Sequence, residues 1–142
     1  MLAAVLGPLA TSEPTVAVHP AAAAQSWSEQ RVRELTATGQ PVFVNFTAAW
    51  CITCLANERV ALSSPRVAEA LAAKGVRYLK GDWTNRDAAI SNELQRHGRS
   101  GVPLYLLYPA GPGTPEVLPQ ILTEGLVLQA IARSVSTTDP GA

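Results

Sequence analysis

Residues 45–58, NFTAAWCITCLANE, hold both cysteines of the chain, Cys51 and Cys54, with two residues between them. The run VFVNF (42–46) leads into this stretch, and its β-branched and aromatic residues are typical of a buried strand. The sequence therefore predicts a strand that ends just before the cysteines. It also predicts a helix that begins at the Cys-x-x-Cys motif and continues to about Leu62.

Length and charge narrow the possible functions. The chain has 142 residues, of which 47% are hydrophobic and 15% charged, so we expect one globular domain with a core of its own. Eleven Lys and Arg balance eleven Asp and Glu. Without a basic field or a run of like charges, nucleic acid and an anionic membrane surface are not expected as partners.

The N-terminal region reads differently from the rest. Residues 1–10 are apolar, but a helix needs about twenty such residues to cross a bilayer. Residues 11–25 mix Pro, Ala, Ser and Thr without periodicity, as in a linker. Either residues 1–10 end a longer apolar segment, or they are an arbitrary disordered start. We expect the folded domain at 26–136 and a disordered tail at 137–142.

Helix and strand patterns alternate along the domain. A capping box of Ser26 and Glu29 predicts the first helix, and Ser64 with Pro65 and Thr123 predict the starts of two later ones. Thr84 or Asn85 is expected to cap another. The expected helices cover about 27–38, 51–62, 65–74, 85–97 and 124–135, and the expected strands 42–46, 76–81, 102–108 and 116–119. This order predicts an α/β fold with a central mixed sheet flanked by helices on both faces.

Three roles compete for the Cys-x-x-Cys motif. A structural disulfide would close a very short loop and so remove little entropy from the unfolded chain. A metal site needs two more ligands, and His19 and His97 are the only imidazoles, so no metal is expected. In a redox pair, Cys51 at a helix N-terminus gains a stabilised thiolate, and Cys54 lies one turn deeper to resolve a mixed disulfide. The redox role explains the motif best.

The motif also resembles a known family. FVNFTAAWCITC (43–54) is similar to the thioredoxin-family active site, and Gly101, Val102 and Pro103 stand where that family has its cis-proline. The resemblance covers residues 27–135. Within the family, the chain is most similar to the C-terminal periplasmic domain of DsbD-type thiol:disulfide interchange proteins. The stretches that support this are AAWCITCLANE, SSPRVAEAL, YLKGDWTNRD and GRSGVPLYLLY.

The resemblance implies a thioredoxin fold and a protein-disulfide reductase activity. The redox-active disulfide Cys51–Cys54 would carry the electrons without any further cofactor. The implied partners are a membrane-embedded electron-donor domain and a periplasmic thiol:disulfide acceptor protein. The chain would then be a monomeric soluble domain of an inner-membrane protein in the bacterial periplasm. Residues 1–10 would end the last membrane helix, and 11–25 would be the tether.

Two polar residues near the motif are candidates for proton transfer. Asn45 lies six residues before Cys51, where many relatives carry a buried acid, and an amide cannot exchange a proton. Glu58, seven residues after Cys51, matches a glutamate of DsbD-type domains. Glu58 is therefore the candidate proton acceptor. The structural alternatives are a hydrogen bond within the sheet for Asn45 and a solvated helix surface for Glu58.

Three further residues are candidates for partner binding. Trp50 is expected to cover the disulfide and contribute to a docking surface, the alternative being a core aromatic. Pro103 is expected to follow a cis peptide bond, although few X–Pro bonds are cis. The resemblance implies that the Val102 backbone is then free to pair with an extended segment of a partner.

Two other functions stay open beside the relay. One is a free-standing thioredoxin-like protein, anchored or secreted, that reduces its own client. The other is a redox-inactive binding module that keeps the fold for docking, against which the two intact cysteines argue.

Overall fold

A mixed sheet of five strands forms the centre of the molecule, in a computed structural model that describes residues 24–135. The strands are β1 (Gln25–Ser26), β2 (Val42–Thr47), β3 (Arg77–Asp82), β4 (Leu104–Tyr108) and β5 (Glu116–Val117). Their order across the sheet is β1-β3-β2-β4-β5. The first three strands run parallel, whereas β4 is antiparallel to β2 and β5 to β4.

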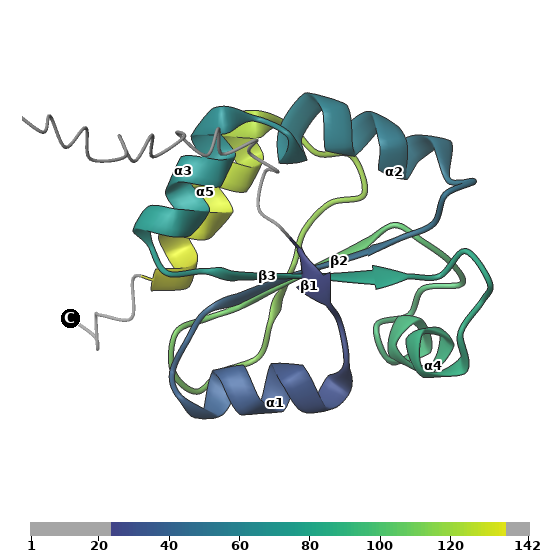
Figure 1. The fold of residues 1–142 in the computed structure, drawn as a ribbon, viewed down its shortest axis with the longest axis horizontal. Coiled ribbons are helices and arrows are strands. Elements are labelled where there is room, and N and C mark those ends of the chain that lie inside the picture. Colours follow the sequence, from purple (N-terminus) through teal and green to yellow (C-terminus); the bar gives the residue numbers. More distant parts are fainter. Residues whose placement is uncertain (1–23, 136–142) are drawn as a thin grey trace, which may run out of the picture.

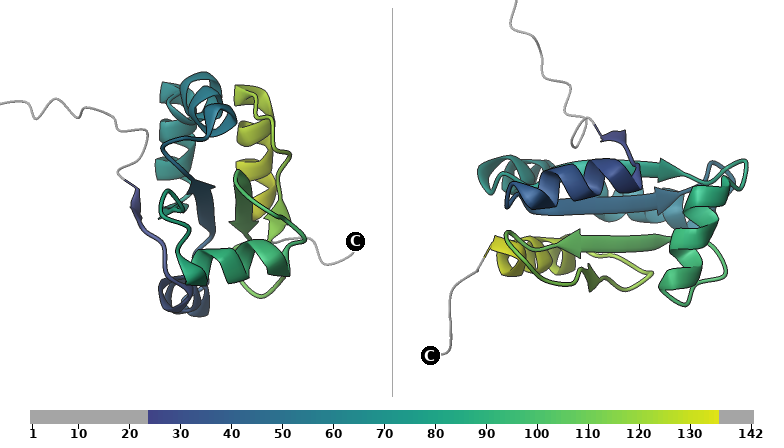
Figure 2. Two further views of the ribbon diagram at one scale, coloured as in Figure 1. Left: turned by 90° about the vertical axis from the view of Figure 1, so that its right-hand side faces the viewer. Right: turned by 90° about the horizontal axis from the view of Figure 1, so that it is seen from below.

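Helices cover both faces of this sheet, as predicted. They are α1 (Glu29–Ala37), α2 (Ile52–Asn57), α3 (Pro65–Ala73), α4 (Ala88–Arg96) and α5 (Glu124–Val135), and a π-helical turn, η1 (Glu58–Leu62), continues α2. Figure 1 shows α2, α3 and α5 above the sheet and α1 and α4 below it, and Figure 2 shows the same layers from two other sides. The predicted α/β class is confirmed.

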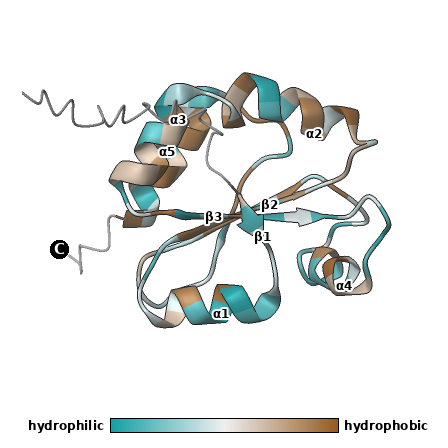
Figure 3. Ribbon diagram, in the orientation of Figure 1, coloured by the Kyte–Doolittle hydropathy of each residue, from teal (hydrophilic) through white to brown (hydrophobic). Residues whose placement is uncertain are grey.

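Strand β2 is the most buried element, with all six side chains buried. Phe43 points into a cluster with α3 and α5, whereas Val44 and Phe46 point into a second cluster with α1 and α4. Burial on both faces explains the nearly continuous apolar run, which appears brown in Figure 3. Because both clusters hold β2 in the centre, its C-terminal end delivers Cys51 at a fixed place.

The start of the first helix differs from the prediction. Ser28, not Ser26, is the N-cap of α1, and its hydroxyl accepts a hydrogen bond from the Arg31 N–H at 3.0 Å. Ser26 belongs instead to β1, where it pairs with Lys80 of β3. The predicted capping box of Ser26 and Glu29 is wrong, because the backbone of Ser26 is committed to the sheet.

The start of α4 also differs. Asp87, rather than Thr84 or Asn85, caps this helix by accepting from the Ile90 N–H at 3.1 Å. Thr84 is engaged elsewhere, in hydrogen bonds with Asp82 and Ala49. The caps predicted from Ser64 with Pro65 and from Thr123 are confirmed.

The ends of the chain lie outside the structural description. The expectations for a membrane remnant and linker at 1–25 and for a tail at 137–142 fall almost entirely on residues outside 24–135. Within 24–135, the helices are too short and too polar to cross a membrane.

Candidate redox site

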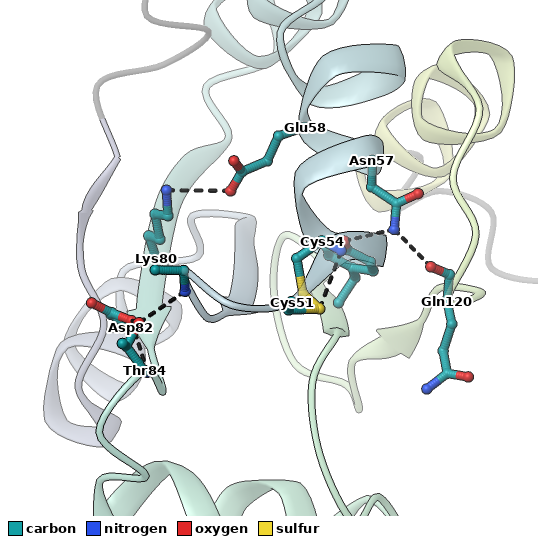
Figure 4. Close-up of a disulfide and its surroundings, with 10 residues drawn as sticks. Cys51, Cys54, Asn57, Glu58, Lys80, Asp82, Thr84 and Gln120 are labelled. Atoms are coloured by element: carbon teal, nitrogen blue, oxygen red, sulfur yellow. Dashed lines mark hydrogen bonds and ion pairs between the residues drawn. A yellow bond between two sulfur atoms is a disulfide. The ribbon is translucent and has the colours of Figure 1, made fainter.

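Cys51 and Cys54 form a disulfide at the N-terminal end of α2. Cys51 is the N-cap residue, and its Sγ accepts a hydrogen bond from the Cys54 N–H at 3.2 Å. Figure 4 shows the two sulfur atoms at the mouth of the helix, with α2 rising above them. A backbone donor aimed at Cys51 Sγ favours the thiolate form once the disulfide opens.

The two sulfurs differ in access. Cys51 retains 7% of its exposure, whereas Cys54 is completely buried. The disulfide that the resemblance implied is present, and Cys54 lies deeper than Cys51, as the sequence predicted. Around this opening, Ile52 and Leu55 of α2 are exposed by 82% and 45%. Exposed apolar side chains next to the less buried cysteine are suited to contact with another protein.

Val102 lies on the other side of the disulfide. It is partly buried and packs against the cluster formed by Ala48, Cys51 and Cys54. The Val102–Pro103 peptide bond is cis, as the sequence predicted, and Pro103 is buried. Val102 is therefore part of the immediate surroundings of the disulfide.

Trp50 is half-exposed, and Thr84 holds both its indole ring and the preceding backbone N–H by hydrogen bonds. Its indole Nε1 donates to the Thr84 carbonyl at 3.1 Å, and the Thr84 hydroxyl accepts from the Ala49 N–H at 2.9 Å. Hydrogen bonds from Thr84 to the Asp82 carboxylate lower the pKa of Asp82. The Trp50 ring packs on Trp83 with centroids 5.9 Å apart. Trp50 thus presents one face to solvent from a fixed position.

Glu58 points to the side of the disulfide that faces β3. Its carboxylate lies 3.3 Å from Lys80 Nζ, and its side chain is 26% exposed (Figure 4). Glu58 and Lys80 line a cleft of about 500 Å³ that also borders Leu55 and Ala48. Ala48 also packs in the buried cluster that contains both cysteines, so the cleft lies next to the residues around the disulfide. The Glu58 carboxylate thus borders an open cleft beside the Lys80 ammonium group.

Asn45 lies under the same region and is buried in β2. Its Nδ2 donates to the Tyr78 hydroxyl of β3 at 2.9 Å, in line with the structural alternative stated for this residue. Its Oδ1 is buried and has no hydrogen-bond partner among residues 24–135. Burial raises the pKa of Tyr78 to about 12. The phenol therefore stays neutral beside the amide at physiological pH.

Asn57 is a buried residue of this region that the sequence did not single out. Its Nδ2 donates to the Tyr105 hydroxyl at 2.9 Å and to the Gln120 carbonyl at 2.7 Å. Its Oδ1 accepts from the Leu122 N–H at 3.0 Å. The side chain thus ties α2 to β4 and to the loop before α5. The available signal was its position three residues after Cys54, on the same buried helix face.

The potential metal ligands are scattered. Within residues 24–135, no three side chains of His, Cys, Asp or Glu come close enough together to hold a metal ion. The two cysteine sulfurs are bonded to each other.

Comparisons with known proteins agree on one family. A family model described as thioredoxin-like matches residues 23–110. The thiol:disulfide interchange protein DsbD of Ralstonia nicotianae is 37% identical over 82 residues, which cover 58% of this chain and 13% of that protein. DsbD 1 of Pseudomonas aeruginosa is 30% identical over 112 residues, covering 73% of this chain and 19% of that protein. The chain thus spans less than a fifth of these relatives.

Solved structures share the fold at low sequence identity. The oxidised C-terminal domain of Neisseria meningitidis DsbD superposes with a TM-score of 0.59 at 17% identity, covering 80% of this chain and all of that domain. A thioredoxin from Thermus thermophilus also gives a TM-score of 0.59, at 19% identity, covering 79% of this chain and 87% of that protein.

Proposed function

This chain belongs to the thioredoxin-like family, and from that premise we propose that it is a thiol:disulfide oxidoreductase that reduces partner proteins through Cys51 and Cys54. The disulfide between Cys51 and Cys54 is the main observation that supports this proposal. Cys51 retains slight exposure and its Sγ accepts a backbone hydrogen bond, whereas Cys54 is completely buried. This asymmetry suits a pair in which one cysteine attacks and the other resolves.

The proposed reaction starts from the reduced pair. The Cys51 thiolate attacks one sulfur of a partner disulfide, forming a mixed disulfide and releasing the second partner sulfur as a thiolate. Cys54 then gives up its proton and attacks Cys51 Sγ. This step restores the Cys51–Cys54 disulfide and releases the first partner sulfur. Two electrons have passed to the partner, which leaves as a dithiol.

Cys54 needs a proton acceptor in the second step. Its sulfur is buried, and burial in apolar surroundings disfavours a thiolate. Glu58 lies one helical turn further along and borders the open cleft described above. The Asn45 side chain has no titratable proton to exchange. We assign the acceptor role to Glu58, and the role of Asn45 is to hold Tyr78 beneath the site.

Partner contact is assigned to the surface around Cys51. Trp50 and Ile52 offer exposed apolar area, and Val102 lines the approach to the sulfur. Pro103 positions Val102. The backbone of Val102 would receive the extended segment of the partner that carries its cysteine.

The DsbD relatives support a specific setting for this activity. In it, the chain is the C-terminal domain of a DsbD-like membrane electron transporter in the bacterial periplasm. A membrane-embedded domain reduces the Cys51–Cys54 disulfide, and the resulting dithiol reduces a periplasmic thiol:disulfide acceptor protein.

Trapping tests the exchange reaction. Reduced Cys54→Ser, mixed with a disulfide-bonded partner protein, should accumulate a mixed disulfide through Cys51 that is visible on a non-reducing gel. Cys51→Ser should trap nothing, because Cys54 is inaccessible. Trapping by Cys51→Ser alone would reverse the two roles, and trapping by neither variant would remove the proposed activity.

The relay setting needs a separate measurement. The oxidised chain is incubated with membranes that contain a DsbD-type donor, thioredoxin and a source of reducing equivalents. Alkylation and mass spectrometry then follow conversion of the Cys51–Cys54 disulfide to a dithiol. A chain that exchanges with partner proteins but stays oxidised under these conditions would be a reductase with another electron source.

A further inference from the structure

A second cleft, of about 510 Å³, lies between α4 and the loop that leads to Val102. Its lining includes Trp83, Gln95 and Ser100 together with two cationic side chains, Arg86 and Arg99. No Asp or Glu lines it. In a chain with balanced charges, this cleft has a local positive charge.

The charges of the two arginines are not neutralised within the described part of the chain. Neither Arg86 nor Arg99 forms an ion pair among residues 24–135. Carboxylates of the same region are occupied: Asp87 caps α4, and Glu93 contacts Arg96 and His97. The two guanidinium groups therefore keep their capacity to bind a carboxylate from another molecule.

Aromatic rings hold one of these cations next to the redox site. The Arg86 guanidinium carbon lies 5.4 Å from the centroid of the Trp50 ring and 5.2 Å from that of Trp83. These distances are typical of cation–π contacts. The backbone of Arg86 has a positive φ of 54°, a conformation that is uncommon for residues other than glycine. The fold therefore fixes a cation beside the exposed tryptophan.

The cleft is continuous with the approach to the disulfide. Trp83 contacts Trp50, the residue before Cys51, and Ser100 lies two residues before Val102. Figure 1 shows α4 and the N-terminal end of α2 at the same end of the sheet. An extended peptide advances about 3.3 Å per residue. A partner segment with its cysteine at Cys51 would therefore extend past Trp50 toward Trp83, which lines the cleft.

We infer that this cleft binds an acidic segment of the partner protein, with carboxylates a few residues from the partner's reactive cysteine. The inference rests on the proposed exchange function and specifies the substrate class for it. Arg86 and Arg99 would donate charge-assisted hydrogen bonds to the carboxylates, while Trp50 and Val102 guide the cysteine.

Peptides of defined charge test this inference. Each peptide carries one cysteine as a mixed disulfide with 2-thiopyridine, a neutral leaving group whose release is followed by absorbance. The residues around the cysteine are glutamate in one peptide, glutamine in the second and lysine in the third. The second-order rate constant of the reduced protein is measured with each peptide at low salt and at about 1 M salt, where charges are screened beyond about 3 Å.

The wild-type protein should react with the glutamate peptide about three to ten times faster than with the glutamine peptide at low salt. The lysine peptide should react more slowly than either. High salt should bring the ratio of the glutamate to the glutamine rate close to one. The Arg86→Gln/Arg99→Gln variant should show a ratio close to one at low salt. Lys74→Gln, which removes one charge at the end of α3, should keep the wild-type ratio.

Other results separate the two proposals. Equal rates with all three peptides would leave the exchange function standing and overturn the acidic-partner inference. An undiminished ratio in the double variant would also overturn it. Reaction with none of the peptides would remove both. Circular dichroism checks that the double variant is folded, and the salt series on the wild-type protein tests the inference without any variant.

Discussion

Lys80 Nζ lies 3.3 Å from the Glu58 carboxylate, and Lys80 is also the residue of β3 that pairs with Asn45 of β2. Lys80 therefore neighbours both Asn45 and Glu58. Asn45 stands where many relatives carry a buried acid, and Glu58 is the acid proposed to accept the proton instead. Both charged residues line the same open cleft, into which Glu58 would release a proton in the proposed reaction. This arrangement makes Glu58 the first residue to test.

Glu58→Gln should slow the resolution of the mixed disulfide by at least about tenfold while leaving the initial attack by Cys51 nearly unchanged. The amide cannot accept the Cys54 proton, whereas the attack uses a thiolate that already exists. Stopped-flow kinetics between about pH 6 and 9 separate the two steps. Glu69→Gln, at an exposed position of α3, is the control with the same charge change. Equal resolution rates for wild type and Glu58→Gln would show that Glu58 is a bystander.

Asn45→Asp should partly restore resolution in the Glu58→Gln background, because it returns a carboxyl group to the layer beneath Cys54. It should also make stability depend on pH. Burial raises the pKa of the introduced carboxyl group above its value in the unfolded chain. The protein therefore keeps its full free energy of unfolding at low pH and loses part of it as the pH rises through the folded-state pKa.

Denaturant titrations of Asn45→Asp should show a loss of about 3 kcal/mol between acidic and mildly alkaline pH, relative to wild type. Asn92→Asp, at an exposed position of α4, should show no such loss. If the difference in unfolding free energy between Asn45→Asp and wild type did not change with pH, water would have to reach position 45.

Asn57→Ala should lower the free energy of unfolding by roughly 3 kcal/mol, because it leaves the Tyr105 hydroxyl, the Gln120 carbonyl and the Leu122 N–H without their partner. Chemical denaturation of the oxidised protein measures this loss. Asn92→Ala removes an exposed amide and should stay within about 0.5 kcal/mol of wild type. A similarly small effect at Asn57 would contradict its role as the tie between α2 and β4.

The three tyrosines should resist ionisation in the folded protein. Burial raises the pKa of Tyr78, Tyr105 and Tyr108 from 10.0 to about 12 in each case. Because the fold favours the neutral phenols, their contribution to stability is complete below pH 10 and is lost as the pH rises through 12. Tyrosinate absorbance should therefore stay low in native protein up to about pH 11. The same titration in guanidinium chloride should have its midpoint near 10, and a native midpoint there would contradict the burial of these rings.

Local chemistry explains which parts of the fold could be predicted. The run VFVNF gave a central strand because β-branched residues buried on both faces are a strong signal. Pro65 and Thr123 mark helix starts through contacts within a few residues. The disulfide, with Cys51 less buried than Cys54, likewise follows from the spacing of the two cysteines at the start of one helix.

Contacts between distant segments explain what could not be predicted. Gln25 and Ser26 have no strand pattern, and they become β1 only through pairing with β3. Asn57 reads as a surface residue until the loop at Gln120 and Leu122 closes over it. The pairing of Arg86 and Arg99 in one cleft depends on the path of the chain around α4.

The two outermost strands of the sheet are each only two residues long. Strand β1 pairs with the middle of β3, at Leu79 and Lys80, and so divides the free edge of β3 into two short pieces. Strand β5 covers β4 at Leu106 and Leu107. Long open edges are where one copy of a protein can template the aggregation of the next. With its edges interrupted in this way, the sheet of residues 24–135 offers little open backbone for edge-to-edge association with a second copy.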